Sequence, residues 1–200
     1  ELQVLPESLC DCARLKSLSV SVSSLQVMPE LIGQLSSLET LNLSNCERLA
    51  ALPDSMCQLP SLATLNLSYC HSLDALPEST GQLSSLTTLI LYNCQSLAAL
   101  PESTGQLSSL ATLLTNLYGC ASLAALPEST GQLTTLTTLN LDCCFSLTAL
   151  PESIGQLTTL TTMILSCCRR LTALPESIGQ FTSLTTLNLA CCESITALPE

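Results

Sequence analysis

The chain of 200 residues is 46% hydrophobic and only 10% charged, and its formal net charge is −11. Five basic residues against sixteen acids exclude a surface built to bind nucleic acid or an anionic membrane. No apolar run approaches the roughly 20 residues that a helix needs to span a bilayer. The sequence therefore predicts no membrane insertion.

Nine of the ten prolines recur at intervals of 23 to 26 residues. They are Pro6, Pro29, Pro53, Pro77, Pro101, Pro127, Pro151, Pro175 and Pro199. A fixed period in the twenties indicates one supersecondary unit repeated along the chain, each copy burying its apolar face on the next. We therefore expect a single domain, residues 1–200, of about eight 24-residue repeats. Because neither end resembles a polar cap, we expect a fragment of a longer chain without its terminal caps.

Each repeat opens with a segment like PESIGQL at residues 151–157, which predicts a short helical turn. Pro151 suits the first helical position, where its missing N–H would have no partner in any case. Glu152 is expected near the positive end of the backbone dipoles. Gly155 is expected to end the turn, because glycine suits a left-handed or helix-ending conformation.

The second half of the repeat, at residues 160–168, has the form L-x-x-M-x-L-x-x-C, which is typical of the strand and bend of a leucine-rich repeat. Met163 and Leu165 flank Ile164 with a period of two, so the pair is predicted to point inward along a strand of about three to five residues. The predicted fold is an α/β right-handed leucine-rich-repeat solenoid. Its parallel β-sheet is expected on the concave face, with short α or 3₁₀ turns on the convex face.

Seven of the thirteen cysteines occupy one position of the repeat, in the bend after the strand. This structural cysteine ladder comprises Cys46, Cys70, Cys94, Cys120, Cys144, Cys168 and Cys192. We expect these small side chains to point into the core and to bond backbone groups. Because they follow the period and a repeat scaffold needs no disulfides, the sequence favours reduced thiols and a cytoplasmic location.

At residues 41–79, LNLSNCERLAALPDSMCQLPSLATLNLSYCHSLDALPES, the chain resembles the leucine-rich-repeat region of plant intracellular immune receptors of the nucleotide-binding type. The shared pattern, L-x-L-x-x-C-x-x-L-x-x-L-P, extends over essentially all 200 residues. The resemblance implies a region that recognises pathogen or host proteins and restrains the other domains of the same parent chain. The chain itself has no G-x-x-x-x-G-K-[ST] phosphate-binding loop.

Side chains vary most just after each predicted strand, at the rim of the arc, whereas the strand positions are monotonous Thr, Ser and Asn. Tyr and Arg most often anchor protein interfaces, and all three tyrosines of the chain lie at this rim. The candidate protein-contact rim comprises Tyr69, His71, Tyr92, Tyr118, Phe145, Arg169 and Arg170. The alternative is that these are ordinary loop residues.

Two further patterns contain residue types that bind metal ions. Asp54 and eight glutamates follow the prolines, but each acid has a simpler role at a helix start than in binding calcium. The adjacent pairs Cys143–Cys144, Cys167–Cys168 and Cys191–Cys192 would each place one thiol outward. Thiols in a line at strand spacing do not converge on one ion, so the sequence predicts no metal and no cofactor.

No Ser/His/Asp set, carboxylate pair or glycine-rich phosphate loop is present, and the chain is predicted not to be an enzyme. Two extra residues in the repeat between Pro101 and Pro127 predict an outward bulge near Leu114–Asn116. The leading hypothesis for function is a protein-recognition scaffold with an unidentified protein partner. A structural or regulatory repeat array without a dedicated ligand, and an inhibitor of a hydrolase, remain as alternatives.

Overall fold

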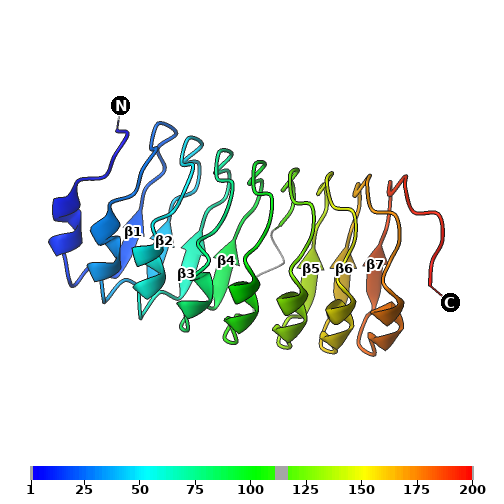
Figure 1. Cartoon of the computed structure of the whole chain (residues 1–200). Helices are drawn as coiled ribbons and strands as arrows, with labels where there is room; N and C mark the ends of the chain where they lie inside the picture. The colour runs from blue at the N-terminus through cyan, green and yellow to red at the C-terminus, as the bar shows by residue number, and fades with distance from the viewer. Residues whose placement is uncertain (1, 111–116, 200) are drawn as a thin grey trace.

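The computed structural model describes residues 2–110 and 117–199, which form a stack of similar coils running from one end of the molecule to the other (Figure 1). The strands lie on one long face: β1 Ser17–Ser19, β2 Thr40–Asn42, β3 Thr64–Asn66, β4 Thr88–Ile90, β5 Thr138–Asn140, β6 Thr162–Ile164 and β7 Thr186–Asn188. The opposite face carries 3₁₀ helices: η1 Glu7–Asp11, η2 Glu30–Gln34, η3 Asp54–Gln58, η4 Thr80–Gln82, η5 Glu102–Gln106, η7 Glu128–Gln132, η8 Glu152–Gln156 and η9 Glu176–Gln180. This arrangement confirms the predicted solenoid. The described 3₁₀ helices are at most five residues long. None of them is long enough to cross a membrane.

Every strand pair is parallel and in the register that the repeat predicts. Leu41 pairs with Leu65, and Leu65 pairs with Leu89. Strands β1–β4 form one sheet and β5–β7 another. The predicted bulge near Leu114–Asn116 lies outside the described residues.

Backbone hydrogen bonds continue the stack between the two sheets. The N–H of Asn93 donates to the carbonyl of Tyr118 at 2.7 Å, and the N–H of Gly119 donates to the carbonyl of Asp142 at 2.8 Å. These bonds join the loops that follow β4 and β5 through the coil between them. The loop rim is therefore continuous where the two sheets are separate.

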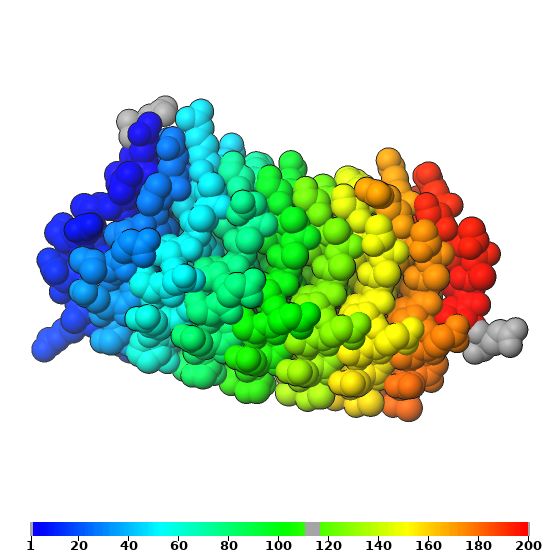
Figure 2. All heavy atoms as spheres, viewed as in Figure 1, coloured from blue at the N-terminus to red at the C-terminus, as the bar shows by residue number. Residues whose placement is uncertain are grey.

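The core is a series of leucine rungs along the axis of the stack. Met163 and Leu165 are fully buried and Ile164 is half-buried, as the alternation predicts. Burying a leucine contributes about 1.5–3 kcal/mol, and each coil buries several against its neighbours. Leu187, in the last described coil, is 40% exposed, because no described coil packs on its outer side. Figure 2 shows the coils packed in chain order.

Seven of the prolines sit one position earlier than predicted, at the N-cap of a 3₁₀ helix, whereas the N-cap of η4 is Ser79. Pro151 is the N-cap residue of η8, with an extended backbone (φ −68°, ψ 149°), and Glu152 is the first helical residue. The carbonyl of Pro151 accepts the first bond of the turn, from the N–H of Ile154 at 3.1 Å. The prediction that proline occupies the first helical position was therefore wrong. Proline suits the N-cap here because its fixed φ is compatible with extended backbone.

Where a 3₁₀ turn carries a glycine and another turn packs beside it, the glycine serves close packing between coils, not the end of a helix. Gly155 lies inside η8 and has no left-handed backbone. A Cβ added there would lie 2.6 Å from the Cβ of Ser177, and one added at Gly131 would lie 2.3 Å from the carbonyl oxygen of Ser153. The predicted helix-ending role was wrong, because the lack of a side chain is what lets successive turns approach.

The acids after three of the prolines, Glu102, Glu128 and Glu152, link their own coil to the next. Glu152 begins η8, and its carboxylate accepts hydrogen bonds from the backbone N–H groups of Glu176 (3.3 Å) and Ser177 (3.2 Å) at the start of η9. Glu128 and Ser153 form the same contact one coil earlier, at 3.3 Å. A row of carboxylates thus satisfies free N–H groups at successive helix starts.

Candidate protein-contact rim

From β2 onward, the described bends that follow the strands turn through a residue with left-handed backbone. This position, one residue before the ladder cysteine, has φ between 58° and 73° at Asn45, Tyr69, Asn93, Gly119, Cys143, Cys167 and Cys191. Glycine and asparagine tolerate such backbone, whereas for other residues this conformation costs about 1–2 kcal/mol of free energy. Sequence reasoning missed this conformation. A signal was available in the sequence: Asn45, Asn93 and Gly119 occupy equivalent positions of the repeat, and Asn and Gly are the residue types that best tolerate left-handed backbone.

Asparagines at the strand ends fix the start of this bend. The side-chain oxygen of Asn66 accepts a hydrogen bond from the N–H of Ser68 at 2.9 Å, and that of Asn140 accepts one from the N–H of Asp142 at 2.9 Å. Such side chain-to-backbone bonds two residues ahead form a turn. The monotonous asparagine column on the strand face therefore positions the variable residues of the rim.

The ladder cysteines anchor the bend from inside. Each thiol donates to a backbone carbonyl of the preceding coil, for example Cys94 to Leu67 at 3.1 Å and Cys120 to Leu91 at 3.2 Å. The first six of the ladder are buried and Cys192 is half-buried in the last coil. Burial raises the pKa of the Cys120 thiol to about 12, so these groups stay protonated and unreactive at neutral pH.

Four candidate contact residues gather into one group on the rim, which we call the tyrosine cluster: Tyr69, His71, Tyr92 and Tyr118. The ring centroids of Tyr69 and Tyr92 lie 5.2 Å apart, and those of Tyr92 and Tyr118 lie 4.9 Å apart. The His71 ring meets Tyr69 edge-on at 6.1 Å. The amide of Asn93 donates to Nε2 of His71 at 3.3 Å. Aromatic contacts of this kind contribute about 0.5–1.5 kcal/mol each beyond area burial, so the cluster is ordered before any partner binds.

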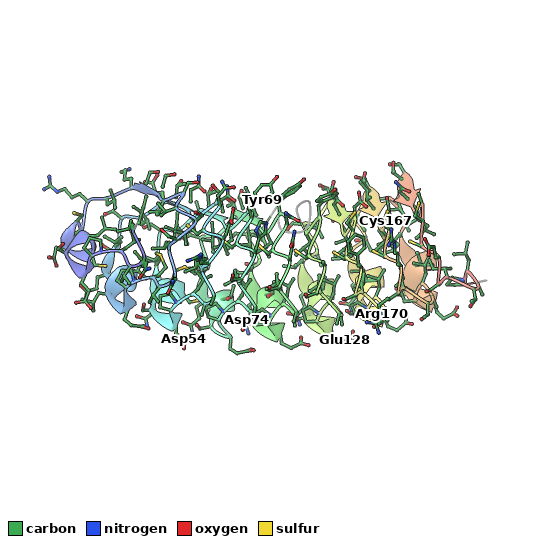
Figure 3. The ribbon with its side chains drawn as sticks, turned by 90° about the horizontal axis from the view of Figure 1, so that it is seen from above. Asp54, Tyr69, Asp74, Glu128, Cys167 and Arg170 are labelled. Carbon is green, nitrogen blue, oxygen red and sulfur yellow. The ribbon has the colours of Figure 1, made fainter. Side chains whose placement is uncertain are left out.

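Two more candidates form a separate pair further along the rim. The guanidinium carbon of Arg169 lies 5.3 Å from the centroid of the Phe145 ring, within cation–π range. Phe145 remains 40% exposed. Arg170 does not join either group: Figure 3 places it along the opposite long edge of the molecule from Tyr69 and Cys167. The structure thus brings six of the seven candidates into two groups.

The strand face beside the rim is uniform. Thr64, Thr88, Thr138 and Thr162 are all half-buried at the same strand position. Their neighbours are the asparagines and isoleucines at the strand ends. The described part of this face carries no aromatic or charged side chain within a strand, so chemical variety is concentrated on the rim.

Comparisons with known proteins agree with this architecture. A family model described as R13L1/DRL21 LRRs matches residues 1–70, and one described as Zer-1-like leucine-rich repeats matches residues 54–116. The leucine-rich repeat domain of the type III effector XopL is 27% identical, with a TM-score of 0.83 over 100% of this chain and 68% of that chain.

The chain is a leucine-rich-repeat region.

Two receptor structures share the fold at greater distance. The plant peptide hormone receptor RGFR1 in complex with RGF2 is 22% identical, with a TM-score of 0.63 over 96% of this chain and 37% of that one. PEPR1–AtPEP1 is 25% identical, with a TM-score of 0.59 over 98% of this chain and 32% of that one. This leucine-rich-repeat region therefore spans about a third of each receptor chain. The comparison with curated proteins found no match.

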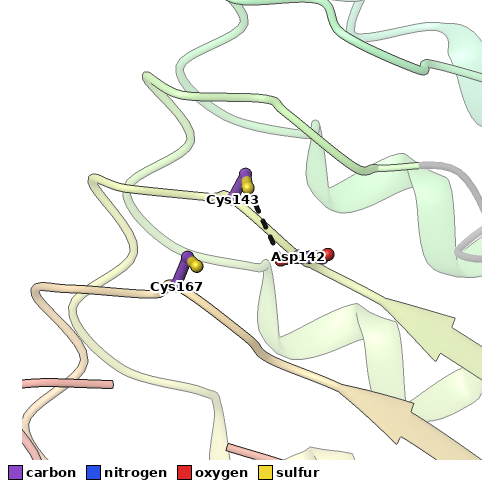
Figure 4. Close-up of side chains that lie close together, drawn as sticks. All are labelled: Asp142, Cys143 and Cys167. Carbon is purple, nitrogen blue, oxygen red and sulfur yellow. Dashed lines mark hydrogen bonds between the residues drawn. The ribbon is translucent and has the colours of Figure 1, made fainter. Parts of the chain in front are cut away.

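One group of side chains on this leucine-rich-repeat region was not foreseen as a unit. The ligand atoms of Asp142, Cys143 and Cys167 all lie within 4.8 Å of one another (Figure 4). The sequence reasoning paired neighbouring cysteines with each other and did not consider the acid beside them. Asp142 also borders the tyrosine cluster, since the backbone N–H of Gly119, next to Tyr118, donates to the carbonyl of Asp142 at 2.8 Å. Repulsion from the Cys143 thiolate raises the pKa of Tyr118.

Proposed function

We propose that this leucine-rich-repeat region is a non-catalytic scaffold that binds a protein partner through its loop rim. The observation that carries the proposal is the tyrosine cluster, in which three coils each contribute one tyrosine to a single group, with Tyr69 exposed and Tyr92 and Tyr118 half-buried. Tyrosine is enriched at the energetic centres of interfaces, because it presents large rigid area and a polar tip. The Phe145–Arg169 pair extends the same edge.

The specific class we propose is the sensing and autoregulatory repeat region of a plant-type intracellular immune receptor. The cysteine form of the repeat and the match to the R13L1/DRL21 repeats over residues 1–70 support this class. Its partners would be a pathogen or host protein and the other domains of the same parent chain. Among the similar structures, RGFR1 is in complex with RGF2 and PEPR1 is paired with AtPEP1, in those proteins.

A cytoplasmic location belongs to the same proposal. All thirteen cysteines are free, and the ladder thiols have a hydrogen-bonding role in the core that requires them to stay reduced. A reducing compartment preserves that arrangement.

A structural array without a dedicated ligand is the second candidate, favoured by the uniform strand face. Affinity capture from plant cell extract distinguishes the two, using the wild-type chain, the triple variant Y69A/Y92A/Y118A and the control D74A/R170A. The control removes exposed side chains on the opposite edge (Figure 3).

A captured protein is then purified, and its affinity for each variant is measured by titration calorimetry. The rim proposal predicts at least tenfold weaker binding for the triple variant and no change for the control. Equal affinity of the triple variant and the wild type would place the contact elsewhere. A wild-type chain that captures nothing would favour the structural array.

A further inference from the structure

Asp142, Cys143 and Cys167 form a group whose role is independent of the proposed protein partner. Asp142 and Cys143 follow β5, and Cys167 occupies the equivalent place after β6. All three side chains are half-buried, so solvent reaches the group (Figure 4). Two sulfur ligands and one carboxylate from consecutive coils thus share a small volume.

The separations match those of ligands around one tetrahedral ion. Oδ1 of Asp142 lies 3.5 Å from Sγ of Cys143. With Zn–S near 2.3 Å and Zn–O near 2.0 Å, two tetrahedral ligands of these kinds lie about 3.5 Å apart, and two sulfurs about 3.8 Å apart. The second thiol, within 4.8 Å of both other atoms, needs to move by no more than about 1 Å, which a side-chain rotation supplies.

The backbone holds the two thiols in parallel. Cys143 and Cys167 have nearly the same left-handed φ, 61° and 59°. The N–H of Cys143 donates to the carbonyl of Ser166 at 2.9 Å, and that of Cys167 donates to the carbonyl of Ala190 at 2.8 Å. The first bond ties Cys143 to the residue just before Cys167. Equal backbone geometry in adjacent coils therefore directs both Cα–Cβ bonds to the same side.

We propose that Asp142, Cys143 and Cys167 form a binding site for a thiophilic divalent cation, Zn²⁺ by preference, with water as the fourth ligand. Two thiolates and one carboxylate suit Zn²⁺ and its softer relatives, whereas Ca²⁺ and Mg²⁺ require oxygen ligands. Binding displaces the protons of both thiols. The hydrogen bond from Cys143 to Asp142 is then replaced by two bonds to the ion. The bound ion would join two coils directly beside the tyrosine cluster.

The test uses the whole chain, reduced with a phosphine and kept under nitrogen, with Co²⁺ and Zn²⁺ as probes. Tetrahedral Co²⁺ bound to thiolates gives visible d–d bands and a near-ultraviolet charge-transfer band, and Zn²⁺ displaces it. The expected result is one equivalent of Co²⁺ with both bands, which Zn²⁺ abolishes. A titration without a thiolate charge-transfer band would overturn the proposal.

The repeat itself supplies variants that keep the fold. Cys143→Asn and Cys167→Asn install the residue that Asn45 and Asn93 place at the same left-handed position. Each is expected to weaken Co²⁺ binding at least tenfold while leaving the circular dichroism spectrum and the unfolding midpoint unchanged or raised. Asp142→Ser, the residue found at Ser68 and Ser166 in this register, is expected to weaken binding by a similar factor.

Cys191→Asn is the matched control, because Cys191 holds the same register and a φ of 59° one coil further on but is not part of the converging group. It is expected to bind Co²⁺ as the wild type does. Equal loss in this control, or unchanged binding in Cys143→Asn, would overturn the site. A reduced protein that takes up no ion, together with a Cys143–Cys167 disulfide in the protein as isolated, would assign the pair to redox chemistry instead.

Discussion

The rings of Tyr92 and Tyr118 stack with centroids 4.9 Å apart and an interplanar angle of 12°, although the repeat that separates them carries two extra residues. The N–H of Asn93, beside Tyr92, donates to the carbonyl of Tyr118. The bend that contains Tyr118 therefore lies in register with the bend that contains Tyr92, despite the insertion between them. The tyrosine cluster depends on this alignment.

The stack should be measurable as a coupling between the two rings. In a double-mutant cycle of Tyr92→Ala and Tyr118→Ala, followed by urea denaturation, we expect a coupling of about 0.5–1.5 kcal/mol. Tyr69→Ala with Phe145→Ala, which lie three coils apart, serves as the control and should be additive to within about 0.5 kcal/mol. Additive behaviour of the Tyr92–Tyr118 pair would show that the stack adds no stability.

Glycine packing between the 3₁₀ turns gives a second prediction. Gly131→Ala forces a Cβ to within 2.3 Å of the carbonyl oxygen of Ser153, and we expect it to lower the unfolding free energy by about 1–3 kcal/mol. Gly179 holds the same position in the last coil, where an added Cβ meets nothing within 4 Å. Gly179→Ala should therefore be neutral or stabilise by up to about 1 kcal/mol. Chemical denaturation of both variants checks the contrast, and equal effects would rule out coil contact as the reason for glycine.

The sequence predicts the overall fold well, because aligning the repeats shows which residues are equivalent in successive copies. The repeat length, the alternation along each strand and the inward position of the cysteines all follow from that alignment. Met163, Leu165 and Cys168 are buried as that reasoning requires. Equivalence says nothing, however, about how closely two coils approach. The reason for Gly155 was therefore wrong, and the link from Glu152 to the next coil was not foreseen.

The rim was predicted in part. The position of the tyrosines in the repeat placed them at the bends, and the structure gathers them into one cluster. The sign of φ at Tyr69 and Cys143 is set by the shared path of the bend, whereas residue propensity alone favours negative φ for both. Arg170 follows Arg169 in sequence, yet it lies along the opposite long edge from Tyr69 and Cys167 and joins neither group of the rim.

The buried thiols predict a loss of stability in alkali. Burial raises the pKa of Cys120 and of Cys168 to about 12, from the ordinary thiol value of 9.0. Between about pH 9 and pH 12 the unfolded chain has lost these protons and the folded chain retains them, so rising pH favours unfolding. Each thiol should lower the unfolding free energy by up to about 1.4 kcal/mol per pH unit in this window, with no effect below pH 8.

Urea denaturation of the wild type and Cys120→Ala between pH 7 and pH 11 isolates this contribution from the titration of tyrosines and lysine. The variant loses stability at every pH because it lacks the bond to Leu91. Its stability should nevertheless fall less steeply above pH 9 than that of the wild type. Parallel curves would mean that Cys120 ionises as readily in the folded chain as in the unfolded one.

The left-handed bend offers a stabilising substitution that touches neither the tyrosine cluster nor the core. Cys191 is exposed and has a φ of 59°, a conformation that asparagine adopts at lower cost. We expect Cys191→Asn to raise the unfolding free energy by about 1 kcal/mol in chemical denaturation. Cys12→Asn is the control, because Cys12 is also exposed but has a φ of −78°, and it should change stability by no more than about 0.5 kcal/mol. If both variants gained equally, the benefit would come from removing an exposed thiol and not from relieving the backbone. A gain confined to Cys191→Asn would show that the chain sacrifices stability where it places cysteine at this bend, as it also does at Cys143 and Cys167.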